Sequence, residues 1–413
     1  MRALTLIRTD PDLRIIAVLM LLVGALACSF GPYAALLAVK TFGLGDPGYA
    51  LLLAFSTLVS VTAALYVGIR ADQTLRRRGL SLAAAGLSVA GVALMVVAPG
   101  RNSFILAHGV LLPLSSTYFG QLFAQARLAA QHHPPETRDA IMASIRALFA
   151  LPFVVVLPLW SLAFGQGAGV LSVYPVSLGL AAVTLVLTWR YWPRDGSPAG
   201  NDRPSGLSLR AALRELAHLP LALRVLALGA VNSGGTVYWA VLPLVLVAET
   251  GRGTADVALY AGLVAGAEVP FMLALPLVLH RFRRTGLILA GTLIYALHLL
   301  GLPVLAGSPW LWLLILPAAI GNAVTLTLPI AYLQDLLASR PGTGAALMAL
   351  QRLSGDIIAA VCFALGTVLA GYGMVAVLAA LVSITGALAL HLTERQRSGV
   401  RSAPAPRDKG RSR

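Results

Sequence analysis

Glu268 places a carboxylate in the middle of a predominantly apolar run, residues 255–279, that is long enough to cross a bilayer. A charged side chain at the bilayer centre costs about 2.5 to 3.5 kcal/mol on insertion scales, so such residues usually face the interior of a helix bundle. Two roles fit this position. Glu268 could bind and release a proton in each cycle of a transporter, or it could form a fixed ion pair between two helices.

Arg352 and Asp356 form a second charged pair within an apolar segment. Because they are four residues apart, they share one face of a helix and can neutralise each other. Alternatively, the two side chains line a cavity and bind a polar or charged solute, or Asp356 is a second proton carrier.

The elements that must position these residues are membrane spans. Of the 413 residues, 58% are hydrophobic and 11% are charged, and the mean hydropathy is +0.82, values typical of a polytopic membrane protein. About 20 apolar residues are needed for each span. On that criterion we predict an all-α integral membrane protein with twelve spans: 15–39, 48–69, 79–99, 104–128, 139–164, 170–190, 221–247, 255–279, 286–306, 310–336, 343–370 and 372–391.

The net charge of +15 is explained by topology rather than by nucleic-acid binding. Counted along the chain, 26 of the 31 basic residues lie before, between or after the predicted spans on one side of the membrane. The other side holds Lys40, Arg101 and Arg252, while Arg146 and Arg352 lie within spans. By the positive-inside rule, both termini are expected in the cytoplasm.

A polar stretch after the sixth span divides the chain into two halves. The expected domains are residues 1–192 and 221–392 as six-helix bundles, 193–220 as a cytoplasmic linker and 393–413 as a disordered basic cytoplasmic tail.

The two halves also repeat each other at an offset near 207 residues. RRRGLSLA at 76–83 is answered by RRTGLILA at 283–290, and AIMASIR at 140–146 is answered by ALMALQR at 346–352. Parallel six-span repeats place a substrate site near the midplane between the halves, with access alternating as one half rocks on the other.

Several motifs resemble a known family. The loop GIRADQTLRRRGL, residues 68–80, is similar to the signature of the major facilitator superfamily between spans 2 and 3, with Gly68, Asp72 and the arginines 76–78 at matching positions. Within that superfamily the chain resembles the bacterial sugar efflux transporter family. The matching segments are GQLFAQAR at 120–127, the region of Arg146, GLVAGAEVP at 262–270 and LQDLLASRPGTGAAL at 333–347.

The resemblance implies a major facilitator fold and proton-coupled export of small sugars or glycosides across the bacterial inner membrane. The chain departs from the family at Arg352 and Asp356, where uncharged residues are expected. Because spans 5 and 8 pack together in this superfamily, the resemblance also implies that Arg146 is the partner of Glu268. The expected gate or latch residues are Asp72, Arg76 and Arg77 in the loop, and Arg127 and Asp335 at equivalent ends of spans 4 and 10.

A sugar site needs hydrogen-bonding side chains and an aromatic face. Residues on spans 4, 7 and 10 offer both: His108, Tyr118, Gln121, Asn232, Tyr238, Trp239 and Asn322.

We expect no enzyme activity, cofactor or metal, because the sequence has no catalytic constellation, no phosphate-binding glycine loop and no cluster of metal ligands. The expected partners are a small solute, protons and the lipid bilayer, and we expect a monomer. Two alternatives stay open. One is efflux of drugs or other metabolites by proton antiport, and the other is a non-transporting membrane sensor built on a transporter fold.

Overall fold

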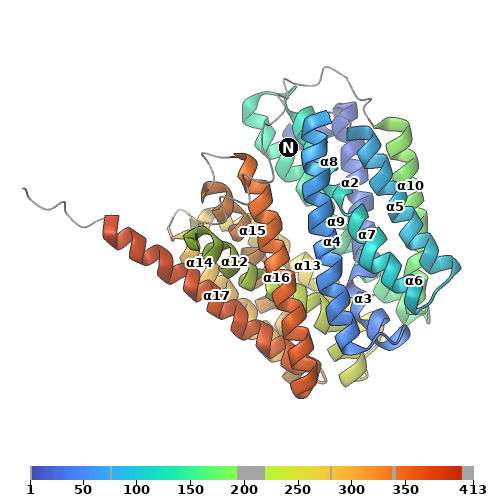
Figure 1. The fold of residues 1–413 in the computed structure, drawn as a ribbon, viewed down its shortest axis with the longest axis vertical. Helices are drawn as coiled ribbons and strands as arrows, with labels where there is room; N and C mark the ends of the chain where they lie inside the picture. The colour runs from blue at the N-terminus through green and yellow to red at the C-terminus, as the bar shows by residue number, and fades with distance from the viewer. Residues whose placement is uncertain (1, 75–76, 193–218, 280, 337–340, 402–413) are drawn as a thin grey trace, which may run out of the picture.

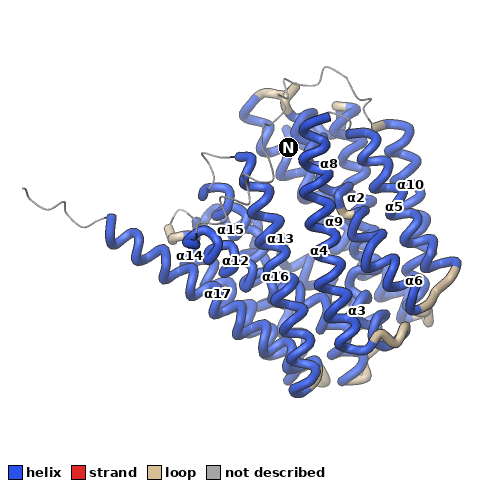
Figure 2. The backbone as a smooth tube through the Cα atoms, in the orientation of Figure 1, coloured by secondary structure: helices blue, strands red, loops and turns tan. Residues whose placement is uncertain are grey.

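The computed structural model describes residues 2–74, 77–192, 219–279, 281–336 and 341–401. Every regular element among these residues is helical (Figure 2). The predicted linker, 193–220, lies outside the described residues as far as residue 218, and so do Arg76 and residues 402–413.

The N-terminal half begins with the short α1, and its helices lie together on one side of the molecule (Figure 1). Its helices are α1 (Arg2–Thr9), α2 (Pro11–Phe30), α3 (Ala34–Leu36), α4 (Gly45–Thr74), α5 (Arg77–Val97), α6 (Arg101–Leu106), α7 (Leu112–Ser115), α8 (Thr117–Ala130), α9 (Pro135–Gly165) and α10 (Val173–Tyr191).

The C-terminal half repeats the pattern. Its helices are α12 (Leu219–Pro243), which continues as η5 (Leu244–Glu249), α13 (Thr254–Leu279), α14 (Arg284–Leu305), η6 (Pro309–Leu314) with α15 (Ile315–Leu336), α16 (Pro341–Ala370) and α17 (Tyr372–Arg401).

All twelve predicted spans are helical, and within the described residues eleven form helices long and apolar enough to cross a membrane. The exception is the predicted span 104–128. This segment changes to a π-helix at Ala107–Leu111, contains Pro113 in α7 and is broken at Ser116 before α8 begins. Proline lacks the N–H that would continue the helical ladder, so it favours an interruption near this position.

Among the described residues, the hydrophobic cluster that joins the two halves lies toward one end of the molecule. We call the end that holds the N-terminus and the arginine-rich connections the basic end, and the other end the opposite end. One hydrophobic cluster, which includes Tyr49 and Phe363, joins the halves toward the opposite end. Toward the basic end each half has a cluster of its own, around Leu122 in the N-terminal half and Leu333 in the C-terminal half. The ribbons of the two halves diverge toward the basic end (Figure 1).

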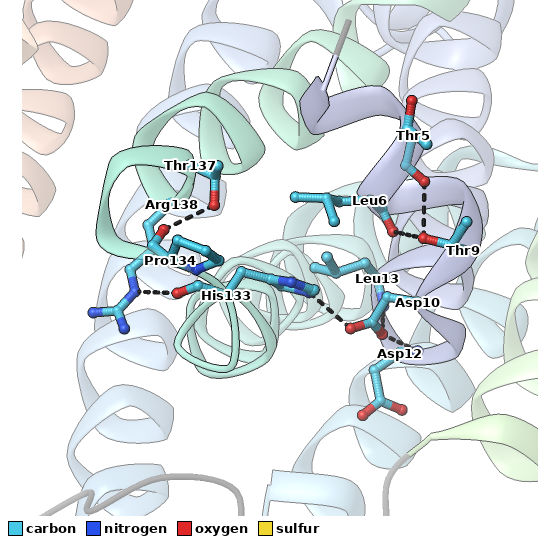
Figure 3. Close-up of polar contacts among 10 residues, drawn as sticks. All are labelled: Thr5, Leu6, Thr9, Asp10, Asp12, Leu13, His133, Pro134, Thr137 and Arg138. Carbon is cyan, nitrogen blue, oxygen red and sulfur yellow. Dashed lines mark hydrogen bonds and ion pairs between the residues drawn. The ribbon is translucent and has the colours of Figure 1, made fainter.

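A polar junction fixes the start of α2 at the basic end (Figure 3). Asp10 is the N-cap residue, and its Oδ1 accepts hydrogen bonds from the backbone N–H groups of Asp12, at 2.9 Å, and Leu13, at 3.1 Å. Its Oδ2 lies 2.9 Å from Nε2 of His133 in the α8–α9 connection. The Arg138 side chain donates to the His133 carbonyl at 3.0 Å. The junction therefore links α2 to the start of α9.

Part of the segment expected to be a disordered tail is helical. α17 continues to Arg401, so residues 393–401 are helical. The reason is a contact that the sequence alone does not reveal: Glu394 forms an ion pair of 2.5 Å with the buried Arg224 of α12 and accepts a hydrogen bond from the Tyr332 hydroxyl at 3.0 Å.

Candidate transport site

Glu268 lies on α13 inside the C-terminal half, with 9% of its surface exposed. Its carboxylate accepts a hydrogen bond of 2.7 Å from Nδ2 of Asn322 on α15. Glu268 and Asn322 were both expected at the site, and the structure brings them together.

The predicted ion pair between Glu268 and Arg146 is not formed in this structure, because the register of α9 and α13 separates the two residues. A Cβ atom on Gly262 would lie 2.8 Å from Cδ of Pro158, and one on Gly266 would lie 3.6 Å from Cγ1 of Val154. The two helices are therefore antiparallel, and Glu268 lies level with residue 152 of α9. Arg146 is six residues further toward the basic end, an axial offset of about 9 Å at 1.5 Å per residue.

Arg146 is exposed, whereas Glu268 is buried. Among the described residues, no arginine or lysine forms an ion pair with Glu268. The neighbour of Glu268 is therefore a neutral amide in this conformation.

Asp356 on α16 lies at the contact between the halves. Its Oδ2 accepts a hydrogen bond of 3.0 Å from Thr57 of α4, in the N-terminal half, and its Oδ1 accepts one of 2.6 Å from Thr236 of α12. The expected pair with Arg352 is present at 3.8 Å, with the Arg352 side chain 65% exposed and that of Asp356 10% exposed. The carboxylate is therefore held by hydroxyls from both halves, while the Arg352 side chain is mostly exposed.

Two aromatic rings and one amide lie where α12 meets α9 and α16, and a second amide lies in the N-terminal half. The Trp239 ring of α12 lies 6.0 Å from the Phe153 ring of α9, so the pair bridges the two halves. Asn232 packs where α12 and α16 meet, since a Cβ on Gly355 would lie 2.9 Å from its Nδ2. Gln121 of α8 is buried, and its Oε1 has no hydrogen-bond partner in the described part of the chain.

Two predicted substrate residues lie elsewhere. Nε2 of His108 is 2.9 Å from the Tyr174 hydroxyl, and its ring stacks on Phe104. The Tyr118 hydroxyl is 2.5 Å from Oγ1 of Thr188. Both side chains therefore point toward α10 inside the N-terminal half, and we leave them out of the site. Sequence alone could not exclude them, because it places a residue on a helix without fixing which face meets a neighbour.

Tyr238 also points inward. It is 3% exposed, its ring lies 5.4 Å from that of His298, and its hydroxyl has no hydrogen-bond partner in the described part of the chain.

The structure also places the expected gate residues. Arg127 is exposed on α8. Asp72 belongs to α4, Arg77 begins α5, and Asp335 lies near the end of α15. All four therefore lie toward the basic end, where the two halves diverge.

Sequence reasoning missed the residues that hold the Asp356 carboxylate and the hydrogen bonds at the opposite end. Thr57 and Thr236 look like ordinary span residues, because a threonine hydroxyl often bonds a carbonyl of its own helix. At the opposite end, the Tyr372 hydroxyl of α17 donates to Oδ1 of Asp46 at 2.9 Å, and its backbone N–H donates to Oε1 of Glu249 at 2.8 Å. No local pattern marks these contacts, since the bonded residues are far apart in sequence.

Comparison with known proteins identifies the architecture. The family model described as Major Facilitator Superfamily matches residues 120–360, more than half of the chain. The chain belongs to the Major Facilitator Superfamily. It is thus a multi-pass membrane protein of a transporter family, as its motifs and twelve helical segments predicted.

One relative matches most of the chain. A protein of Deinococcus radiodurans named "Putative sugar efflux transporter" is 27% identical over 380 residues, which cover 88% of this chain and 93% of that protein. The similarity agrees with the resemblance seen in the motifs.

Solved structures share the fold. The nucleoside transporter NupG matches with a TM-score of 0.73 and 13% identity, over 94% of this chain and 100% of that one. The human organic anion transporter MFSD10 matches with a TM-score of 0.60 and 17% identity, over 92% of this chain and 100% of that one. At these identities the likeness shows the fold alone.

Proposed function

We propose that this major facilitator exports small sugars or glycosides across the bacterial inner membrane in exchange for protons. The observation that carries the proposal is the setting of Glu268, a buried carboxylate hydrogen-bonded to the Asn322 amide and without a cation paired to it among the described residues. The similarity to the Deinococcus radiodurans protein supports the choice of solute.

The setting of Glu268 favours a titrating role over a fixed ion pair. Burying an ionised carboxylate without a compensating charge is costly, and binding a proton removes that charge. The Asn322 amide can donate to either form of the carboxyl group, so proton loss and gain need no rearrangement of this partner. Movement of α13 against α9 would then change how far the positive charge of Arg146 lies from the carboxylate.

The solute site is proposed at the contact between the halves. Trp239 and Phe153 offer aromatic faces from opposite halves, while Asn232 and Gln121 offer amides. Sugars are bound in this way, with their C–H surfaces on aromatic rings and their hydroxyls on polar side chains. The wide exposure of Arg352 favours a second candidate, efflux of a negatively charged metabolite by the same proton antiport.

The basic end is proposed to face the cytoplasm, as the positive-inside rule requires. The structure would then correspond to the state open to the cytoplasm. Arg77, Arg127, Asp72 and Asp335 are proposed to make contacts that close this end in the outward-facing state.

Inverted membrane vesicles loaded with a proton gradient test the proposal. Labelled sugars, glycosides and anionic metabolites are offered in turn, and both solute uptake and proton movement are followed. We expect E268Q to abolish gradient-driven uptake while solute exchange without a gradient continues, because exchange needs no net proton transfer. The matched control is D256N on the same helix, where the carboxylate pairs with Arg252.

Two outcomes would count against the proposal. Solute-linked proton movement that persists in E268Q would remove the coupling role of Glu268. A wild-type protein that moves only the anionic metabolites would replace sugar export by the second candidate.

A further inference from the structure

An apolar groove lies on the outside of the N-terminal half. It has a volume of about 500 Å³, with walls from α4 and α5 and a floor where α7 meets α8. Leu58, Thr62 and Tyr66 line one wall, Ala84 and Leu87 the other, and Leu114 the floor. None of the predicted solute-binding residues contributes to the lining.

The groove faces away from the transport site. Thr57 marks the side of α4 that meets the C-terminal half, because it donates to Asp356. Tyr66 is nine residues further along, about 180° around the helix at 3.6 residues per turn. Leu58 and Tyr66 are 52% and 59% exposed. The groove therefore opens toward the bilayer.

Each wall of the groove ends in an arginine at the basic end. On α4, Arg70 follows Tyr66 by one turn, its Nε lies 3.4 Å from the Tyr66 hydroxyl, and its guanidinium lies 6.0 Å from the ring centre. On α5, Arg77 precedes Ala84 by seven residues and Leu87 by ten, so it shares their face of the helix. The apolar groove thus ends at two arginine side chains.

We propose that this groove binds one anionic phospholipid of the leaflet at the basic end. Its acyl chain lies along the groove, and its phosphate oxygens accept hydrogen bonds from Arg70 and Arg77. The apolar side chains of the groove pack against the acyl chain. The guanidinium groups bind the phosphate through charge-assisted hydrogen bonds. Basic residues next to membrane helices select anionic lipids in the same way.

The lipid would connect the ends of α4 and α5. It contacts both walls at once, on either side of the short connection at residues 75–76. The proposal does not depend on the transported solute, because the groove lies on the far side of α4 from Asp356.

Lipid binding to the purified full-length protein in detergent tests the inference. Phosphatidylglycerol and phosphatidylcholine with identical acyl chains are added, and bound lipid is counted by native mass spectrometry. We expect one tightly bound phosphatidylglycerol and no such phosphatidylcholine. The double variant R70Q/R77Q should weaken phosphatidylglycerol binding about 30-fold, given the typical contribution of each basic residue near an anionic surface.

Two further variants separate charge from shape. R8Q/R281Q removes two exposed arginines from the same end but away from the groove, and it should bind phosphatidylglycerol as the wild type does. A83F places a ring in the groove at an exposed lining position and leaves both arginines intact. It should lose the bound lipid, with circular dichroism confirming that the helices remain folded.

Three results would overturn the inference. Equal binding of the two lipids by the wild type would show that no anionic headgroup is selected. Unchanged phosphatidylglycerol binding in R70Q/R77Q would place the lipid elsewhere. Displacement of the lipid by glycerol phosphate, which has no acyl chain, would show that the arginines bind a soluble anion and that the groove is not used.

Discussion

The Tyr372 hydroxyl donates a hydrogen bond of 2.9 Å to the Asp46 carboxylate, and this bond joins the two halves at the opposite end. The Tyr372 ring also lies 5.6 Å from the Lys40 ammonium group. Gly371 precedes Tyr372 with a φ of 83°, a conformation that glycine adopts without strain, so the chain can turn sharply from α16 into α17. Residues from both halves therefore meet at one side chain.

Y372F should make the opposite end open more often. The substitution keeps the ring and removes only the bond to the Asp46 carboxylate, a loss of about 1.5 to 3 kcal/mol that corresponds to at least about a tenfold change in population. Spin labels at positions 101 and 310, on different halves at this end, would report the change as a larger population of long distances. Y191F, at the basic end, is the matched control. An unchanged distance distribution in Y372F would show that the bond does not hold this end closed.

Thr57 and Thr236 donate to the same carboxylate, but only Thr57 does so from the other half. T57V and T236V each remove one hydrogen bond to a charged group, with an expected cost of about 1.5 to 3 kcal/mol. T236V should lower the thermal unfolding midpoint without changing the distance between the halves. T57V should also shift that distance, measured with the same pair of labels. Identical behaviour of the two variants would contradict a role for Asp356 in joining the halves.

The close approach of α9 and α13 depends on Gly262. Because a Cβ at this position would lie 2.8 Å from Pro158, G262A must push the two helices apart, with an expected cost of about 1 to 3 kcal/mol. G266A is the matched control on the same helix, since its Cβ would meet Val154 at an ordinary 3.6 Å. Thermal unfolding of both variants in detergent checks the difference. Equal midpoints would mean that the helices pack less tightly than the structure indicates.

Two truncations test whether the ion pair between Glu394 and Arg224 stabilises the end of α17. A chain ending at residue 392 loses Glu394 and leaves the buried Arg224 without its ion-pair partner, which should cost about 3 kcal/mol. A chain ending at Arg401 keeps the pair and should unfold at the wild-type temperature. E394Q in the full-length chain removes the charge alone and should reproduce part of the loss. If both truncations unfold alike, the pair does not stabilise the helix end.

The individual spans could be predicted from sequence because the bilayer imposes a local rule. Each crossing requires about 20 apolar residues in one continuous helix, so a segment such as 255–279 reveals itself without knowledge of its neighbours. The segment 104–128 shows the limit of this rule. Its composition predicts a continuous span, and although Pro113 favours an interruption nearby, the position of the break at Ser116 depends on how the chain packs there.

Contacts between residues close together in sequence could also be predicted. Arg352 and Asp356 form the predicted ion pair because a helix places residues four apart on one face. Glu268 and Asn322 could be nominated separately, since a polar group in an apolar run is conspicuous. Their hydrogen bond could not be predicted, because it depends on the relative rotation of α13 and α15.

The sequence by itself was enough to predict the twelve helical segments, the superfamily and the charged residues within the spans. The tertiary structure alone decided which of these residues meet. Glu268 contacts Asn322 and not Arg146 because the register of α9 and α13 separates the two charges along the helix axis. Asp356 is hydrogen-bonded to Thr57, and Tyr372 to Asp46, because helices remote in sequence meet where the halves join. Such contacts depend on helix rotation and axial register, which packing sets and local composition does not encode.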